Sequence, residues 1–487
     1  MRPSRKLFTV ANWWSGSDMA DDGTQTGRRP RIAVFGHYGN QNLGDEAIIE
    51  AVMANLRKHI PGVDLHCFSI NPFDSAQRHN VPAFPIRYRS DYPAGLHYPS
   101  GHDSTAPVAA TSERPSASTE VPGTSLQGAA KKPSWKARVK SFPVLGSAVA
   151  LLQKAARLRH TLPQEAGFLR FAKAQLEDID LLLVTGSNQF LDNFGGPWGF
   201  PYTLLKWTLL AKQTNTRVAF ISIGAGPLSH PLSFWMLRRA LRRADYLSFR
   251  DQGSFDLISD KVGIGGPVVP DLAHSLSYQP PEPGQTASED SLHIAVNPMP
   301  VFDSRYWHVG DDTRYREYVG KLADLCTTIL SDGARLTLFS TQLRDEDVIT
   351  DVMTLIAQGN TATTAQQRIT VAKSRSVRQL MDTLSSADLV VATRFHATVL
   401  PLQLGIPVLG ICYYRKAAEL LDDVGLGAYH VDINGFASDQ LIAKYQNLVS
   451  RISQGDVLLH ENLTQYQRAL DIQYQQIAAL ILPEKTS

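Results

Sequence analysis

The sequence has few cysteines, little net charge and no long apolar run. Three cysteines occur in 487 residues, and Cys67, Cys326 and Cys412 lie far apart with no CxxC pair and no histidine cluster nearby. This spacing argues against a disulfide scaffold or a zinc ribbon and is typical of a reducing compartment. The formal net charge is only +2, so we expect no global field that would bind nucleic acid.

The sequence also lacks the apolar segments that are typical of transmembrane helices and signal peptides. No 18 consecutive apolar residues occur, so we predict no transmembrane helix. Arg2, Arg5 and Lys6 are not followed by an apolar segment before Trp13, so we predict no signal peptide. We therefore expect a soluble, cytoplasmic protein. The hydrophobic share of 43% is sufficient for the cores of two large domains.

Alternating apolar strands and amphipathic helices indicate an α/β protein with two Rossmann-like domains. We expect a disordered tail at 1–30, a first domain at 31–277, a linker rich in Pro and Gly at 278–291, a second domain at 292–455 and a helical tail at 456–487. Repeated strand–helix units favour parallel sheets covered on both faces. Two such domains joined by one linker would face each other across a cleft.

An insertion interrupts the first domain at about residues 85–175. Much of it is rich in Ser, Thr, Pro, Ala and Gly and cannot bury a core, so we expect disorder. Residues 131–160 contain eight Lys or Arg and no Asp or Glu, mixed with apolar side chains. This segment is either a solvated basic surface or a peripheral anchor on anionic lipid at the inner face of the membrane.

A glycine-rich loop at residues 36–46 connects the first predicted strand to a helix. Such a loop can expose backbone N–H groups beside the positive end of the helix dipole. The glycines lie at 36, 39 and 44 and no Lys-Ser/Thr pair follows, so the loop is not a P-loop. Asp45 and Glu46 either complement the helix dipole or act on a substrate that carries hydroxyl groups.

Cationic side chains follow several later strands. Arg250 follows a strand at 246–249, and Arg394 and His396 follow an apolar strand near 388–392. Ligands of open α/β sheets bind at the carboxyl ends of the strands. The arginine fork matches a carboxylate or phosphate, and histidine transfers protons near neutral pH. The arginines therefore either bind an anionic ligand or form structural ion pairs.

In order along the chain, these segments resemble the polysaccharide pyruvyl transferase family. The resemblance covers about residues 31–80 and 175–435 and rests on Gly39–Glu46, Ser248–Asp251, Pro270–Asp271, Ser340–Gln342 with Asp345, Arg394–His396, Gly405–Pro407 and Lys416. It implies a GT-B-like fold and an enzyme that transfers pyruvate from phosphoenolpyruvate onto two hydroxyls of a sugar. The product would be a cyclic ketal in an exopolysaccharide or another cell-surface polysaccharide.

The resemblance, with the chemistry of the donor, assigns expected roles. We expect His396 to protonate the donor or support the leaving phosphate, and Asp45 or Glu46 to act on the acceptor hydroxyl. The acceptor would be a polysaccharide or its lipid-linked precursor. We expect no cofactor and assign no metal ligands, and the sequence does not identify a metal requirement. The expected substrate-binding residues are Arg250, Arg394, Lys416, Asn40, Asn42, Gly44, Asn188 and Gln342.

One departure and two alternatives remain. Residues 185–189 replace a run of glycines that the family usually carries, which leaves acceptor specificity undefined. A GT-B-type glycosyltransferase would instead use a nucleotide sugar and need a nucleobase pocket. A non-catalytic assembly protein of polysaccharide synthesis would dock through 131–160 and would not require Arg250, Arg394 and His396.

Overall fold

The computed structural model describes residues 28–39, 41–88, 163–280, 291–307, 309–359, 366–456 and 459–482. The predicted disordered tail as far as residue 27, most of the insertion with its basic segment 131–160, and most of the linker lie outside these ranges. Asn40 also lies outside them. Among the described residues, no helix combines the length and apolar character needed to cross a membrane.

The first domain is a parallel sheet with the strand order β3-β2-β1-β4-β6, and both β7 and the short β5 pair with β6. Its strands are β1 (Arg31–Phe35), β2 (Asp64–Ser69), β3 (Ala83–Pro85), β4 (Leu181–Thr185), β5 (Asn188–Phe190), β6 (Arg217–Ala225) and β7 (Tyr246–Phe249). Its helices include α1 (Leu43–His59), α2 (Pro72–His79), α5 (Phe200–Gln213), α6 (Pro231–Leu241) and α7 (Gln252–Val262), with short 3-10 turns η1 (Gly196–Trp198) and η2 (Leu272–Ser275).

The second domain is also a parallel sheet, with the order β10-β9-β8-β11-β12-β13. Its strands are β8 (His293–Asn297), β9 (Arg335–Ser340), β10 (Ile369–Lys373), β11 (Leu389–Ala392), β12 (Val408–Cys412) and β13 (His430–Asp432). Its helices are α8 (Asp312–Ser331), α9 (Asp345–Gln358), α11 (Val377–Ser385), α12 (Phe395–Gln403), α13 (Arg415–Asp423) and α14 (Ser438–Ser453), and α15 (His460–Ala479) follows. The prediction of two Rossmann-like α/β domains is thus confirmed.

Helix α1 illustrates how the sequence pattern becomes packing. Ile48, Val52 and Leu56 recur at every fourth position and are fully buried. Burial of one such side chain contributes roughly 2 kcal/mol, so this face secures the helix to the sheet. The Asn42 side chain accepts a hydrogen bond from Gly44 N and fixes where the helix begins.

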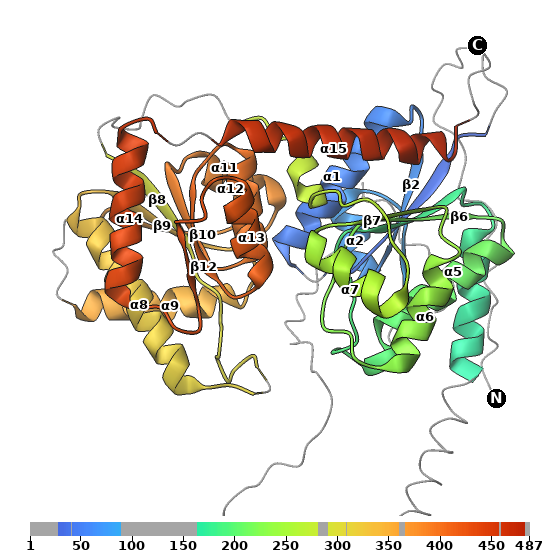
Figure 1. Cartoon of the computed structure of the whole chain (residues 1–487), viewed down its shortest axis with the longest axis horizontal. Coiled ribbons are helices and arrows are strands. Elements are labelled where there is room, and N and C mark those ends of the chain that lie inside the picture. Colours follow the sequence, from blue (N-terminus) through green and yellow to red (C-terminus); the bar gives the residue numbers. More distant parts are fainter. Residues whose placement is uncertain are drawn as a thin grey trace, which may run out of the picture.

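The C-terminal helix α15 returns to the first domain. Figure 1 shows it running from the second domain across the top of the molecule to the first. The Gln473 side chain donates to Ser222 Oγ and accepts from Ser248 Oγ, and Asp471 lies 2.8 Å from Lys58 Nζ on α1. The predicted C-terminal helix therefore ties the two domains together.

The predicted insertion is too wide at both ends. The strand β3 reaches Pro85, and residues 163–176 form a helix. Phe168, Ala172 and Leu176 on that helix are buried in the same core as β4. These apolar residues span only about three helical turns and directly follow the basic segment. The helical period of 163–176 was therefore not recognised in the sequence.

Candidate active site

A cavity of about 570 Å³ lies between the two domains. Its walls come from residues near the ends of strands: Ser187 in the turn after β4 and Arg250 after β7 in one domain, and Thr341 after β9 and Thr393 after β11 in the other. The cavity thus lies at the carboxyl ends of both parallel sheets, where open α/β folds bind ligands.

The two domains touch each other at this cavity. Leu43 N, at the start of α1, donates to Thr341 O at 3.0 Å. Lys416 Nζ of α13 donates across the cleft to Asn188 Oδ1 and to the carbonyl of Ala225, both at 3.0 Å. These bonds hold the two halves of the site in one arrangement.

His396, the second residue of α12, sits between α1 and η2. Its side chain is only 14% exposed, and its Nε2 lies 3.8 Å from Asp271 Oδ2. Within the described residues, that nitrogen has no hydrogen-bond partner. Gly44 lies so close that a Cβ on it would be 2.2 Å from His396 Nδ1, so only glycine leaves room for the imidazole.

Asp271 is the carboxylate behind His396. It caps η2 by accepting from Ala273 N, and its other oxygen lies 3.2 Å from Arg250 Nη1. Burial opposes its charge, but the His396 imidazole and the Arg250 guanidinium outweigh burial and hold the Asp271 pKa well below its usual range. Asp271 is therefore an anion that can orient the imidazole.

Asp45 lines the cavity in the first turn of α1. Asn42 Nδ2 donates to its Oδ2 at 2.7 Å. Burial raises the pKa of Asp45 to about 6, helped by the negative charges of Glu46 and Asp271 and opposed by His396 and the Asn42 bond. A carboxyl with this pKa exchanges protons close to neutral pH.

Glu46, the neighbouring candidate, does not face the cavity. Its side chain is buried, accepts from Gly39 N at 2.9 Å and lies 2.9 Å from His79 Nε2. A Cβ on Gly39 would be 2.4 Å from the carbonyl of Asn71, and the Gly39 φ of 84° also requires glycine. Glu46 thus stabilises the fold of the loop, and its placement gives no support to a role with the acceptor.

Arg250 and Lys416 converge on one amide oxygen. Arg250 Nη2 donates to Asn188 Oδ1 at 2.9 Å, the same atom that accepts from Lys416. Asp251 Oδ2 lies 3.3 Å from Lys416 Nζ. Burial and the Arg250 charge lower the Lys416 pKa to about 8, against the opposing pull of Asp251.

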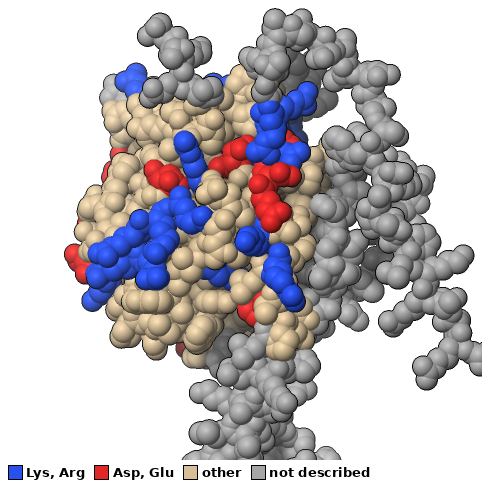
Figure 2. All heavy atoms as spheres, turned by 90° about the vertical axis from the view of Figure 1, so that its right-hand side faces the viewer, with Lys and Arg blue, Asp and Glu red and all other residues tan. Residues whose placement is uncertain are grey.

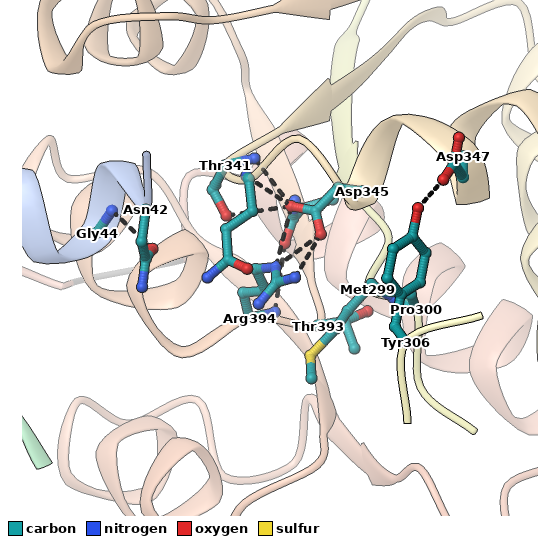
Figure 3. Close-up of polar contacts among 12 residues, drawn as sticks. Asn42, Gly44, Met299, Pro300, Tyr306, Thr341, Asp345, Asp347, Thr393 and Arg394 are labelled. Atoms are coloured by element: carbon teal, nitrogen blue, oxygen red, sulfur yellow. Dashed lines mark hydrogen bonds and ion pairs between the residues drawn. The ribbon is translucent and has the colours of Figure 1, made fainter. Parts of the chain in front are cut away.

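Arg394 is held by a buried carboxylate. Arg394 Nε and Nη2 both donate to Asp345, with the shortest bond at 2.5 Å, and Asp345 is fully buried (Figure 3). Asp345 also accepts from Thr341 N and Gln342 N, so it fixes the loop that carries the predicted Gln342. Both Arg394 and Gln342 line the cavity.

Two helices point their N-termini at the same cavity. The residues at the start of α12 (Arg394 and Phe395) and of α13 (Tyr414 and Arg415) line it. Neither start has a side-chain cap. Free N–H groups at a helix start and the helix dipole together favour an anion.

The structure therefore gathers most of the predicted residues, and it adds some. Asn42, Asn188, Gln342, Arg250, Arg394, Lys416, Asp45 and His396 line the cavity, and Gly44 packs against His396. Asp271 and Asp345, which sequence reasoning did not assign to the site, orient His396 and Arg394. Their signal was present, because both belong to the segments on which the family resemblance rests: Asp271 caps η2, and Asp345 opens α9 after β9.

Aromatic side chains that were not among the expected binding residues form a further part of the wall. Tyr306, Trp307, Phe395 and Tyr414 line the cavity. Such rings can pack on the apolar faces of a sugar. Among the described residues, no group of three or more His, Cys, Asp or Glu is arranged to hold a metal ion.

The sequence is similar to a known protein family and to a protein of polysaccharide biosynthesis. The sequence profile described as polysaccharide pyruvyl transferase matches residues 42–414. The amylovoran biosynthesis protein AmsJ of Erwinia amylovora is 23% identical over 288 residues, which span 56% of this chain and 66% of AmsJ, just under two thirds of its length.

Solved structures support the GT-B-like fold. UDP-GlcNAc 2-epimerase from Neisseria meningitidis, bound to UDP-GlcNAc, has a TM-score of 0.52 at 11% identity and covers 92% of this chain and 100% of its own. MnaA of S. aureus, solved with UDP, has a TM-score of 0.50 at 10% identity and covers 94% and 99%. At such identities the likeness concerns the fold alone. The matched span of the family, which exceeds half of the chain and includes the cavity residues from Asn42 to Tyr414, shows that this chain belongs to the polysaccharide pyruvyl transferase family.

Proposed function

We propose that the chain transfers pyruvate from phosphoenolpyruvate onto two hydroxyls of a saccharide, forming a cyclic ketal, with no metal or cofactor. The observation that carries this proposal is the convergence of Arg250, Arg394 and Lys416 around His396 and Asp45 in one interdomain cavity. Three cations with two proton-transfer groups match a small donor that carries a carboxylate and a phosphate.

Charge and geometry favour this donor. Phosphoenolpyruvate carries about three negative charges near neutral pH, and a hydrogen bond to a charged group contributes about 1.5–3 kcal/mol. Arg394 uses Nε and Nη2 on Asp345, and in the described structure its Nη1 has no protein hydrogen-bond partner. This nitrogen, the uncapped starts of α12 and α13, and Lys416 supply donors for the two anionic groups.

The reaction balances with one proton delivered and two removed. A proton adds to the methylene carbon C3 of phosphoenolpyruvate, and the first sugar hydroxyl forms a bond to C2. The second hydroxyl then forms its bond to C2 as the C2–O bond to phosphate breaks. Of the two hydroxyl protons, one replaces the proton spent on C3 and the other leaves with the phosphate.

We assign the proton steps to two residues. His396, oriented by Asp271 at 3.8 Å, delivers the proton to C3. Asp45, whose pKa of about 6 leaves it mostly ionised at neutral pH, takes the proton from the attacking hydroxyl. The aromatic wall with Trp307 and Tyr414 would receive the saccharide.

Calorimetry tests the donor without knowledge of the acceptor. We expect phosphoenolpyruvate to bind the wild type and to lose at least tenfold affinity in Arg250→Ala, which removes a charged hydrogen bond. Arg316→Ala, an exposed arginine on α8, is the matched control and should bind as the wild type does. Binding of a nucleotide sugar in place of phosphoenolpyruvate would refute the proposal and favour a glycosyltransferase. Equal binding by Arg250→Ala would refute the assigned donor site.

A further inference from the structure

Helix α6 carries a cationic face on the outer side of the first domain. Trp235, Arg238, Arg239 and Arg242 are exposed and recur at helical spacings of three and four residues, and Arg243 lies beside them. These five residues, here called the α6 basic face, line one shallow surface hollow. The opposite side of the helix, including Met236 and Ala240, is buried against α5. Lys and Arg side chains gather on this side of the domain in Figure 2.

The charge of the α6 basic face is not neutralised within the described protein. The helix contains no Asp or Glu. None of the four arginines of the α6 basic face lies within ion-pair distance of a carboxylate in the part of the chain that is described, and the nearby Asp245 pairs with Lys212. Four uncompensated arginines on so small a surface repel one another, and an anionic partner would relieve that cost.

Exposed aromatic rings accompany the arginines. Trp235 is 52% exposed, and Arg239 lies over its ring at 5.6 Å. Phe194 and Trp198, 66% and 67% exposed, belong to the segment 191–199. Asp192 in this segment accepts from Ser229 N and His230 N, directly before α6. Tryptophan and arginine together are characteristic of the interface between a lipid bilayer and water.

Both segments lead directly from the cavity. Asn188 lines the cavity and precedes the segment 191–199, while Gly226 and Pro227 line it and precede α6. The α6 basic face itself begins in the middle of α6 and lies on the outer side of the first domain.

We propose that the α6 basic face, with Phe194 and Trp198, docks on an anionic membrane surface. Charge complementarity with acidic lipid headgroups and insertion of the indole rings at the interface would hold it there. If the function proposed above is correct, docking would concentrate the enzyme on the surface that carries a lipid-linked saccharide. The membrane contact itself does not depend on that function.

The strength of the contact follows from the number of arginines. A basic residue near an anionic bilayer contributes about fivefold to partition, which corresponds to about 1 kcal/mol. Removal of two arginines should therefore weaken vesicle binding about 30-fold at low salt, and added salt should reduce the difference. Arg239 and Arg242 are suitable because both are exposed, whereas Arg238 Nε is bonded to Val262 O.

The test is co-sedimentation of the full chain with phosphatidylglycerol-rich vesicles and with neutral phosphatidylcholine vesicles. We expect salt-sensitive binding to the anionic vesicles, about 30-fold weaker in Arg239→Ala/Arg242→Ala. Trp235→Ala should weaken the binding that persists at high salt. The control Arg316→Ala/Arg468→Ala removes the same charge from exposed positions on α8 and α15 and should bind like the wild type.

Two results would overturn the proposal. One is unchanged vesicle binding in Arg239→Ala/Arg242→Ala while deletion of 131–160 abolishes it, because the basic segment would then be the anchor. The other is a wild type that does not bind anionic vesicles at low salt. Thermal unfolding of the same variants shows that they are folded. Failure of phosphoenolpyruvate to bind any of them in calorimetry would count against the proposed function but not against the docking surface.

Discussion

Replacing Gly44 by alanine should separate activity from stability. A Cβ at this position would lie 2.2 Å from Nδ1, 2.5 Å from Cγ and 2.7 Å from Cβ of His396. Ordinary contact begins at 3.4 Å, so the imidazole must withdraw by about 1.2 Å. Rotation of the ring alone cannot relieve the clash, because the His396 Cβ is itself too close.

The expected loss can be worked from this displacement. A misplacement of about 1 Å at a reacting group costs about 100-fold in rate, or about 2.7 kcal/mol of transition-state stabilisation. Stability should change much less, because Gly44 lies in the first turn of α1 and alanine favours a helix by up to about 1 kcal/mol. Donor affinity should change little, since Arg250, Arg394 and Lys416 are untouched.

The assay is phosphate release from phosphoenolpyruvate with a saccharide acceptor fraction, combined with thermal unfolding and donor calorimetry. Gly320→Ala is the matched control, because Gly320 lies within α8 and a Cβ there meets nothing within 4 Å. That control should raise the midpoint of unfolding slightly and leave turnover unchanged. A Gly44→Ala variant that retains full turnover would refute the assignment of His396 to the reaction.

Three further predictions concern charge. Asp345→Ala leaves the Arg394 guanidinium unpaired, so it should lower the free energy of unfolding by about 3 kcal/mol and weaken donor binding. Denaturant titration and calorimetry measure the two effects, and unchanged values would contradict the pairing. Turnover should rise with pH through about 6 as Asp45 ionises. Donor binding should weaken above about pH 8 as Lys416 loses its proton. Flat pH profiles of turnover and of donor affinity would exclude these roles. Glu46→Gln should lower stability far more than turnover per folded molecule, measured on the same preparation, and selective loss of turnover would restore Glu46 as a candidate base.

The pH dependence of stability has a sign that follows from burial. Folding raises the Asp45 pKa, so the folded state holds this proton more tightly than the unfolded state does. As the pH rises from the ordinary pKa of an aspartate through about 6, ionisation of Asp45 therefore lowers the free energy of unfolding. Asp45→Asn should therefore lose turnover without losing stability at neutral pH. Chemical denaturation of the wild type and of Asp45→Asn across this pH range measures the effect. The free energy of unfolding should fall with pH in the wild type and not in the variant.

The repeated strand–helix pattern and the cations that follow the strands could be predicted from the amino-acid sequence. Ile48, Val52 and Leu56 predict a buried helix face because side chains four apart share one side of a helix. Arg250 and Arg394 were predicted at the ligand-binding edge because parallel strands end at the same side of a sheet. Local periodicity suffices for both inferences.

The position of each candidate side chain depends on the three-dimensional packing of the chain. Asp45 and Glu46 are neighbours in the sequence, but consecutive helical residues point about 100° apart, so one faces the cavity and the other faces His79. The partnership of Arg394 with Asp345 joins residues 49 apart, and Lys416 reaches Asn188 across 228 residues. Such contacts depend on how the two sheets and the returning helix α15 pack together, and no local pattern in the chain specifies that arrangement.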